Sequence, residues 1–293
     1  MNRRWVRAAT RTIGAIGAVG LALFSFSGGD AQQTAAAADY APAPAPAQAD
    51  RSRLREGLAA AQSGDWTGLR AARALAGDPL VKKILTWRLA AVQNSDAVFD
   101  EIDAALKQLK DWPGRETMRR RGEQMIFDSS YGPADRVAWL TQEGGPLTGD
   151  GEIALAQAYA RLSRYSEAQA IAAEAWRERN LTPRAEAIAL AEFGSSFVEQ
   201  DHADRVDRLL WRDQASEAQR LLPRLNASDR AVANARIAMQ RRVRHKTLTR
   251  ALNAVPASRR DDAGYLYDRA RYLRRTDNPV DAMNTIARIV PAS

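Results

Sequence analysis

The spacing of apolar residues constrains the fold of this 293-residue chain more than any other feature. From Arg51 onward, apolar residues recur at steps of three and four, which is the spacing of one face of an α-helix. No long run alternates apolar and polar residues, as a half-buried strand would. The pattern therefore predicts an all-α chain. The clearest helical faces are Leu155, Ala158, Tyr159 and Leu162; Ala168, Ile171, Ala172, Ala175 and Trp176; Ala218, Leu221, Leu222 and Leu225; and Val280, Met283, Ile286 and Val290.

Short polar breaks separate neighbouring helices and predict helical hairpins. Each break has a polar turn, then a capping-type residue, then an Ala- or Leu-rich helix. A short connection makes its two helices antiparallel neighbours, and hairpins must stack to bury their apolar faces. Small residues expected at helix crossings, Ala168, Ala218 and Ala282, are 50 and 64 positions apart, so the repeats are irregular. We predict a superhelical solenoid of antiparallel hairpins, similar to a tetratricopeptide array. The four clearest breaks are 64–69, 163–168, 212–218 and 275–280.

The N-terminal residues are typical of an export signal. Four arginines lie at or before position 11, and the uncharged stretch 12–29 follows them. We expect cleavage after Ala31 or as late as Ala38, and the alternative is a permanent N-terminal anchor. Export places the mature protein in the periplasm, with no stable transmembrane segment after processing. We therefore expect a signal peptide at 1–31, an Ala/Pro-rich linker at 32–50 and an α-superhelical domain at 51–293.

Composition excludes several classes of chemistry. The chain has no Cys and two His, which excludes disulfides, thiolate nucleophiles and Cys-ligated metals. It has no Walker loop and no Gly-x-Gly-x-x-Gly sequence. We therefore predict no cofactor and no bound metal. The net charge is +8, which in a cytoplasmic protein would favour nucleic acid as the partner. An exported protein would instead meet a polyanionic cell-wall polymer or a membrane surface.

The second half of the chain resembles the N-terminal superhelical domain of the soluble lytic murein transglycosylases. Residues 140–290 hold most of the resemblance, and 201–211, with Asp-His, Arg and Leu-Leu-Trp, is its most specific part. Residues 51–139 fit only as generic hairpins. The landmarks are Pro146–Gly151, Ala175–Arg177, Glu186, Phe193-Gly194, Asp201–Trp211, Ala235–Ala238, Val255-Pro256, Asp262–Arg271, Arg274-Arg275 and Ala282.

The resemblance implies a periplasmic protein that acts on peptidoglycan. Members of that family cleave the β-1,4 bond between N-acetylmuramic acid and N-acetylglucosamine and leave a 1,6-anhydro end. Their helices form a ring or horseshoe, and a separate lysozyme-like domain supplies a catalytic Glu followed by Ser. No Glu-Ser dipeptide occurs in this chain. We therefore expect a non-catalytic helical scaffold, either the leading part of a longer gene product or a free-standing relative without the catalytic domain.

Two sets of residues are candidates for functional or structural roles. The first is the cluster Asp201, His202, Arg205, Leu210 and Trp211. We expect Asp201 and His202 to form hydrogen bonds that fix one hairpin against the next, and Trp211 to be buried in the core. The second set comes from residues 241–275, where 11 Lys and Arg face three Asp. Its members, a possible contact patch for polymer, are Arg241, Arg242, Arg244, Lys246, Arg271, Arg274 and Arg275.

The same residues allow other interpretations. The arginines could form only a solvated helix surface, and Arg119–Arg121 is a further basic cluster. The carboxylates of Glu186, Glu192, Glu199, Asp201 and Asp204 could form an acidic site, although exposed helix carboxylates often produce such clusters. Trp112, beside Pro113-Gly114, could stack on a sugar.

The expected partners are peptidoglycan glycan strands and possibly cell-wall synthesis proteins, with no nucleic acid. The alternative function is a non-enzymatic scaffold of the tetratricopeptide type that binds a protein partner.

Overall fold

The computed structural model describes residues 45–289, and within them every regular element is helical. This confirms the predicted all-α class. The predicted signal peptide and most of the predicted linker lie outside the described residues. The first helix begins at Gln48, three residues before the predicted start of the helical domain. The α-helices are α1 (Gln48–Ser63), α2 (Trp66–Leu75), α3 (Pro79–Ala91), α4 (Phe99–Gln108), α5 (Arg115–Met125), α6 (Pro133–Leu140), α7 (Gly149–Arg161), α8 (Tyr165–Glu178), α9 (Pro183–Phe193), α10 (Glu199–Trp211), α11 (Ala215–Leu221), α12 (Ala227–Arg241), α13 (His245–Asn253), α14 (Ala263–Arg275) and α15 (Pro279–Ile286).

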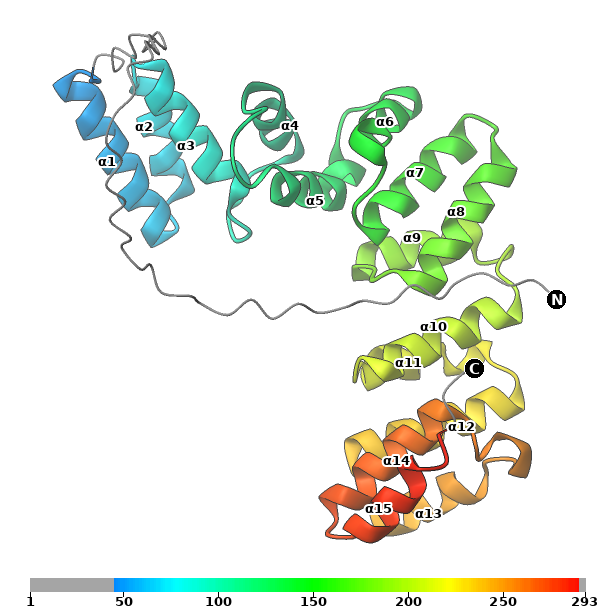
Figure 1. Ribbon diagram of the computed structural model, residues 1–293. Helices are drawn as coiled ribbons and strands as arrows, with labels where there is room; N and C mark the ends of the chain where they lie inside the picture. The colour runs from blue at the N-terminus through cyan, green and yellow to red at the C-terminus, as the bar shows by residue number, and fades with distance from the viewer. Residues whose placement is uncertain (1–44, 290–293) are drawn as a thin grey trace, which may run out of the picture. The chain divides into compact units, whose positions relative to one another are not determined.

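Helices pack mainly on their neighbours in sequence (Figure 1). The most extensive packing is within the hairpins α1/α2, α7/α8 and α14/α15, and α10 also packs on α11. These are the four hairpins that the sequence predicts. Helices of successive hairpins also pack together, as α8 does on α10 and α12 on α14. This order of contacts is that of a helical solenoid. Among the described residues, no helix combines the length and apolar composition that a membrane crossing requires.

The four hairpins share one turn geometry although their spacing in sequence is irregular. In each, a residue with positive φ stands two positions before the second helix begins. The residue five positions after this turn residue is buried in every case, and this places a side chain of the second helix against the first. The turn residues, with the buried residues that follow them, are Gly64 (φ 78°) and Leu69, Ser163 (φ 62°) and Ala168, Asp213 (φ 59°) and Ala218, and Asp277 (φ 61°) and Ala282.

The core follows the array as a chain of apolar clusters rather than as one centre. One cluster contains Leu69, Ile102 and Leu140 and involves α1 to α7. The next, around Trp176 and Leu210, involves α7 to α12. A third lies between α12, α13 and α14, and a small fourth lies within α2 and α3. Each helix therefore buries its apolar face on nearby elements, as expected of stacked hairpins.

Two of the three arginines in the 119–121 cluster are buried, which neither predicted interpretation allowed for. Arg121 donates from Nη1 to the carbonyl of Ala90 at 2.6 Å and from Nη2 to Ser95 Oγ at 2.8 Å. Arg119 donates to the carbonyls of Gln142 and Gly145 at 2.7 and 3.1 Å. Both side chains donate to carbonyls at the end of α3 or in the segment after α6, so they join these segments instead of facing a polymer.

Candidate functional site

Asp201 joins the start of α10 to α8, as predicted. Its Oδ2 accepts a hydrogen bond from the backbone N–H of Val198 at 2.9 Å, and this satisfies one free donor of the helix N-terminus. Its Oδ1 accepts from Arg177 Nη1 of α8 at 2.5 Å. Both carboxylate oxygens of Asp201 therefore accept hydrogen bonds within the protein, and the side chain fixes one hairpin against the next.

His202 is buried by packing rather than held by hydrogen bonds, which corrects the prediction. Its ring lies edge-on to Trp176 and Phe197, with centroids 5.7 and 5.9 Å apart. Its Nδ1 is buried and has no hydrogen-bond partner among the described residues. Burial lowers the pKa of His202, and the charge of Arg224 lowers it further. A neutral imidazole in this apolar setting is a core residue, not a proton shuttle.

Arg205 of α10 links three helices from within the core. Its Nη2 donates to Glu186 Oε2 of α9 at 2.7 Å, and its Nη1 donates to the carbonyl of Trp176 of α8 at 3.0 Å. Arg220 of α11 reaches the other oxygen of Glu186 at 3.2 Å. Burial lowers the pKa of Arg205, while Glu186 opposes that shift. Arg205 is 2% exposed, so the ion pair stabilises the helix stack rather than binding a ligand.

The other carboxylates of the possible acidic site do not converge on one point. Glu192 accepts from Gln157 at 2.6 Å and from Arg161 at 3.3 Å, on the face of α7. Glu199 is exposed at the first position of α10. Asp204 accepts from Gln200 within the same helix at 2.6 Å. With Glu186 bound to arginines, no pair of these groups frames a substrate as an acid and a base would.

The last two members of the predicted cluster differ in burial. Leu210 is buried as expected, but Trp211 is 44% exposed, so the prediction that it is a core residue is wrong. Trp211 is the last residue of α10 and lies over Tyr267 of α14 with ring centroids 4.9 Å apart. One face is therefore covered by the next hairpin while the rest of the ring remains open to solvent.

Trp112 is also less available than a sugar-stacking loop residue would be. It is half-buried beside Trp87, with ring centroids 6.4 Å apart and an angle of 48° between the planes. Trp87 Nε1 donates to the carbonyl of Pro113 at 2.7 Å and fixes the loop. The pair therefore joins α3 to the loop before α5.

A further buried arginine, Arg236, whose role sequence reasoning missed, lies beside Trp211. Arg236 Nε donates to Asp268 Oδ2 at 2.8 Å, and Arg236 also pairs with Asp207. Burial raises the pKa of Asp268 although Arg236 opposes the shift. A Cβ on Gly264 would lie 2.5 Å from Arg236 Nη1, so this glycine makes room for the guanidinium. The signal in the sequence that could have revealed Arg236 was its place on the apolar helical face that contains Val232 and Met239.

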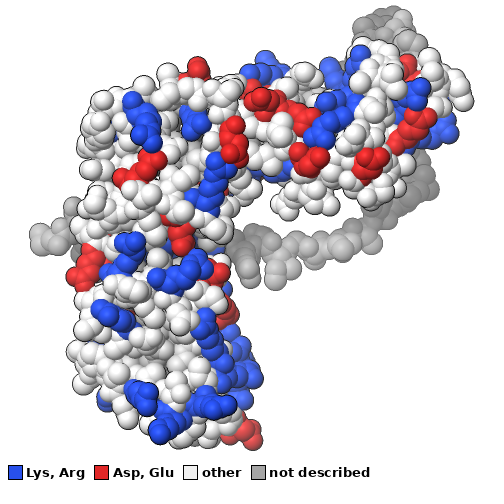
Figure 2. Space-filling view, turned by 180° about the vertical axis from the view of Figure 1, so that it is seen from behind, with Lys and Arg blue, Asp and Glu red and all other residues white. Residues whose placement is uncertain are grey.

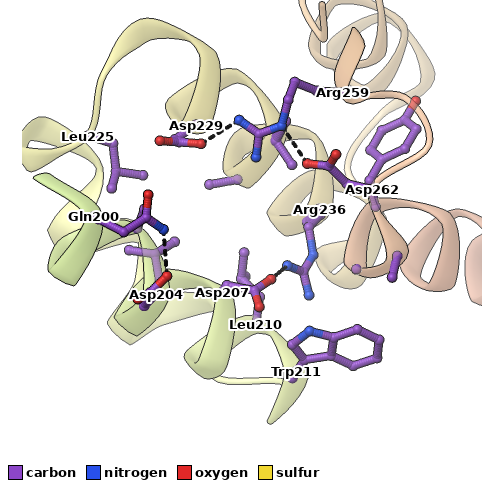
Figure 3. A pocket seen from close by; sticks show the side chains of 17 residues that line it. Gln200, Asp204, Asp207, Leu210, Trp211, Leu225, Asp229, Arg236, Arg259 and Asp262 are labelled. Carbon is purple, nitrogen blue, oxygen red and sulfur yellow. Dashed lines mark hydrogen bonds and ion pairs between the residues drawn. The ribbon is translucent and has the colours of Figure 1, made fainter. Parts of the chain in front are cut away.

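A cleft of about 370 Å³ opens between α10, α12 and the start of α14 (Figure 3). Arg259 bridges Asp229 and Asp262 at 2.6 Å each. Asp207 and Trp211 lie on the opposite side of the cleft, and Arg236 lies beside both of them. Every labelled acid of the cleft has a polar partner within it, so the cleft can accept or donate hydrogen bonds but presents no free proton donor. Among residues 45–289, no group of three or more His, Asp or Glu side chains could hold a metal ion.

The predicted polymer-contact arginines separate into two groups. Arg271 binds Asp213 at 2.5 and 3.1 Å, and Arg241 binds Gln219 and Ser216, so both have partners in neighbouring hairpins. The remaining five are exposed, and no described carboxylate forms an ion pair with them. We term these five residues the basic patch: Arg242, Arg244, Lys246, Arg274 and Arg275.

The basic patch lies at one end of two parallel helices. Arg259, just before α14, meets Asp229 near the start of α12, and Asp268 meets Gln240 farther along both helices. Helices α12 and α14 therefore run in the same direction, and their C-terminal ends are neighbours. Arg242, Arg274 and Arg275 at these ends interact favourably with the dipoles of α12 and α14, whereas Arg244 and Lys246 stand at the start of α13. Figure 2 shows Lys and Arg side chains gathered over the lower part of the array, where α12 to α15 lie.

Comparisons of the chain with protein-family models, with curated proteins and with solved structures found no match. The resemblance to the superhelical domain of lytic transglycosylases therefore stays a prediction from the landmarks of the sequence.

Proposed function

We propose that the helical array is a non-catalytic scaffold of an exported, lytic-transglycosylase-like protein. It holds anionic strands of peptidoglycan while a separate lysozyme-like domain supplies catalysis. The observation that supports this proposal is the basic patch, five exposed cations without a carboxylate partner in the described part of the chain. The stem peptides of peptidoglycan provide carboxylates in a repeating array, which is the complementary charge.

The patch is suited to a polymer rather than to a small anion. Its members come from the end of α12, the start of α13 and the end of α14, and none converges on a buried pocket. Exposed pairs of opposite charge are individually weak, worth about 0–1 kcal/mol each. Several such pairs along one strand add through effective concentration, so a repeating polyanion gains affinity that a single carboxylate does not.

The proposal is tested by co-sedimentation of the purified chain with isolated peptidoglycan sacculi. Replacing Arg242, Arg244 and Lys246 with Gln should weaken binding by about tenfold. The matched control replaces Lys82, Lys83 and Lys110, three exposed lysines outside the patch, with Gln, so its net charge equals that of the patch variant. We expect the control to bind within about twofold of the unchanged chain.

Two results would contradict the proposal. If the unchanged chain does not sediment with sacculi, the array does not bind peptidoglycan. If both triple variants lose binding equally, net charge alone accounts for the interaction and the patch has no special role. Binding at the patch should also weaken steeply as salt rises from about 50 to 300 mM, because screening lengths fall below about 10 Å in that range.

A further inference from the structure

Two hairpins of the array are covered by a following helix in the same way. Helix α9 lies on α7/α8, where its Glu192 accepts from Gln157 and Arg161, and the next residue, Phe193, is buried. Helix α12 lies on α10/α11, where its Arg236 pairs with Asp207 and the next residue, Ile237, is buried. In each case a charged side chain and a large apolar side chain stand side by side in the covering helix.

The residues that these charged side chains contact occupy one position of the repeat. Gln157 and Asp207 each stand six residues before the turn residue with positive φ, Ser163 or Asp213. In α14/α15, counting back six residues from Asp277 gives Arg271, and counting back two gives Arg275. Arg271 is already bound to Asp213, whereas Arg275 has the position of Arg161, two residues before Ser163. Because Arg161 contacts Glu192 of the covering helix α9, Arg275 stands where a carboxylate of a covering helix would lie.

The groove between α14 and α15 is open among the described residues. It has a volume of about 370 Å³ and contains Tyr267, Arg274 and Met283 in its lining. Three apolar side chains of α15 are exposed beside it: Val280 at 68%, Met283 at 70% and Ile286 at 43%. An apolar row flanked by cations is typical of a surface that binds an amphipathic helix.

Comparison with the other hairpins shows that this apolar row is not required by the repeat. The positions of Val280 and Met283, three and six residues after the turn residue, are Ser and Gln in both α8 and α11. All four of these polar residues are exposed, and the two in α11 also bind Arg241 of α12, so this edge of the second helix is polar in the covered hairpins. They are Ser166 and Gln169 in α8, and Ser216 and Gln219 in α11.

We propose that the groove between α14 and α15 binds an amphipathic helix of a partner protein. The helix places a carboxylate beside Arg274 and Arg275, and a large apolar residue next to it packs on Met283 and Ile286. A helix is favoured over a flat anionic membrane because the site is a groove, and because α9 and α12 fill equivalent grooves in this chain. This inference does not depend on polymer binding by Arg242, Arg244 and Lys246.

The experiment measures binding of fluorescent model helices to the full chain by anisotropy. One peptide repeats Glu next to Leu along one helical face, and the other has Lys in place of every Glu. The acidic peptide should bind with a dissociation constant below about 100 µM, and the basic peptide should not bind. Replacing Val280 with Ser and Met283 with Gln, as in α8 and α11, should weaken binding by about tenfold or more.

A matched control separates this site from general adsorption. Leu75 and Leu80 are 66% and 52% exposed in the first hairpins, and Leu75→Ser with Leu80→Gln removes a similar apolar area. This control should bind the acidic peptide within about twofold of the unchanged chain. Arg274→Glu with Arg275→Glu should lose binding of the acidic peptide. All these positions are exposed, so circular dichroism melting should be unchanged in each variant.

Four outcomes would overturn the proposal. The first is that the acidic peptide does not bind, and the second is that both apolar double variants lose binding equally. The third is that the chain self-associates with rising concentration and V280S/M283Q abolishes this self-association. The fourth is that the chain binds phosphatidylglycerol vesicles and V280S/M283Q abolishes vesicle binding but not peptide binding. The third would assign the groove to a second copy of the chain, and the fourth to a membrane surface. Sacculus binding by V280S/M283Q would be unaffected, so failure here is distinct from failure of the proposed function.

Discussion

Single buried arginines fix the junctions where successive helices meet. Arg205 joins α8, α9 and α10 through one guanidinium, and Arg236 joins α10, α12 and α14 through another. Each is paired with a buried or half-buried carboxylate, because an unpaired charge in such a place would cost several kcal/mol. Each donor also has a fixed direction, so these pairs set how one hairpin sits on the next.

A substitution at Gly264 tests the junction at Arg236, because it adds only a methyl group. Replacing Gly264 with Ala should destabilise the fold by about 1–3 kcal/mol, because the new Cβ would lie 2.5 Å from Arg236 Nη1 and 2.6 Å from its Cζ. Urea unfolding followed by circular dichroism measures the change. Gly77→Ala is the control, since its Cβ would meet no atom closer than 3.5 Å, and it should stay within about 0.5 kcal/mol. A neutral Gly264→Ala variant would show that the junction tolerates displacement of Arg236.

His202 predicts a loss of stability in mild acid. Its pKa is lower in the folded protein than its ordinary value of 6.5, chiefly because of burial, with Arg224 also lowering it and Asp201 opposing. The unfolded chain therefore binds a proton more readily, so the stabilisation is complete above pH 6.5 and declines as pH falls toward the folded pKa. His202→Phe keeps an aromatic ring and removes this titration. Between pH 7 and 5 the melting temperature of the unchanged chain should fall more than that of His202→Phe. Parallel profiles of melting temperature against pH would contradict the role assigned to His202.

At this scale the sequence predicted which residues have structural roles, but it predicted their contacts less well. Asp201 was expected to fix a hairpin, and it does so through Arg177 and the start of α10. Hydrogen bonds from His202 and burial of Trp211 were expected wrongly, because spacing along one helix does not show which neighbouring helix covers each residue. The partner of Arg236, Asp268, is 32 positions away in sequence, and no local pattern connects the two.

At the scale of the element, one turn geometry explains the four hairpins that the sequence predicts. Polar breaks marked the hairpins correctly because they contain residues that stop a helix and others that begin the next one. The spacing of 50 and 64 residues between Ala168, Ala218 and Ala282 hid the repeat. The repeat is visible only in the backbone, where Ser163, Asp213 and Asp277 adopt positive φ at equivalent positions.

Ser163 provides a direct test of this shared turn. An L-residue with positive φ costs roughly 1 kcal/mol relative to glycine, and Gly64 already occupies the equivalent position in α1/α2. Ser163→Gly should therefore stabilise the protein by about 0.5–1 kcal/mol, while Ser163→Val should destabilise it, as urea unfolding would show. Ser166→Gly, inside α8, should instead cost about 0.5–1 kcal/mol. Equal effects at the two serines would contradict the turn geometry.

At the scale of the whole described array, the buried carboxylates hold helices together through ion pairs. Asp201, Glu186 and Asp268 are buried and each is bound by an arginine of another helix, while the acids of the open cleft are bound within it. The cations are distributed differently, since the basic patch has no described carboxylate partner. The sequence located these cations within residues 241–275, but only the parallel course of α12 and α14 brings the ends of these two helices next to each other.

This distribution leads to the last prediction, that the chain binds peptidoglycan without cleaving it. Glycoside cleavage requires a carboxylic acid that stays protonated beside the scissile bond and a second group positioned with it. Burial raises the pKa values of Asp268, Glu123 and Glu152, yet each carboxyl already has partners. Asp268 is bound by Arg236, Glu152 accepts from Arg179 at 2.9 Å, and Glu123 accepts from the backbone of Leu147 and Thr148 at 2.8 and 2.7 Å. Purified chain incubated with sacculi should therefore release no 1,6-anhydro-muropeptides by mass spectrometry, whether or not Arg242, Arg244 and Lys246 are intact. Release that persists in the patch variant but disappears in Glu186→Gln or Asp204→Asn would place an active centre in the array and refute its scaffold role.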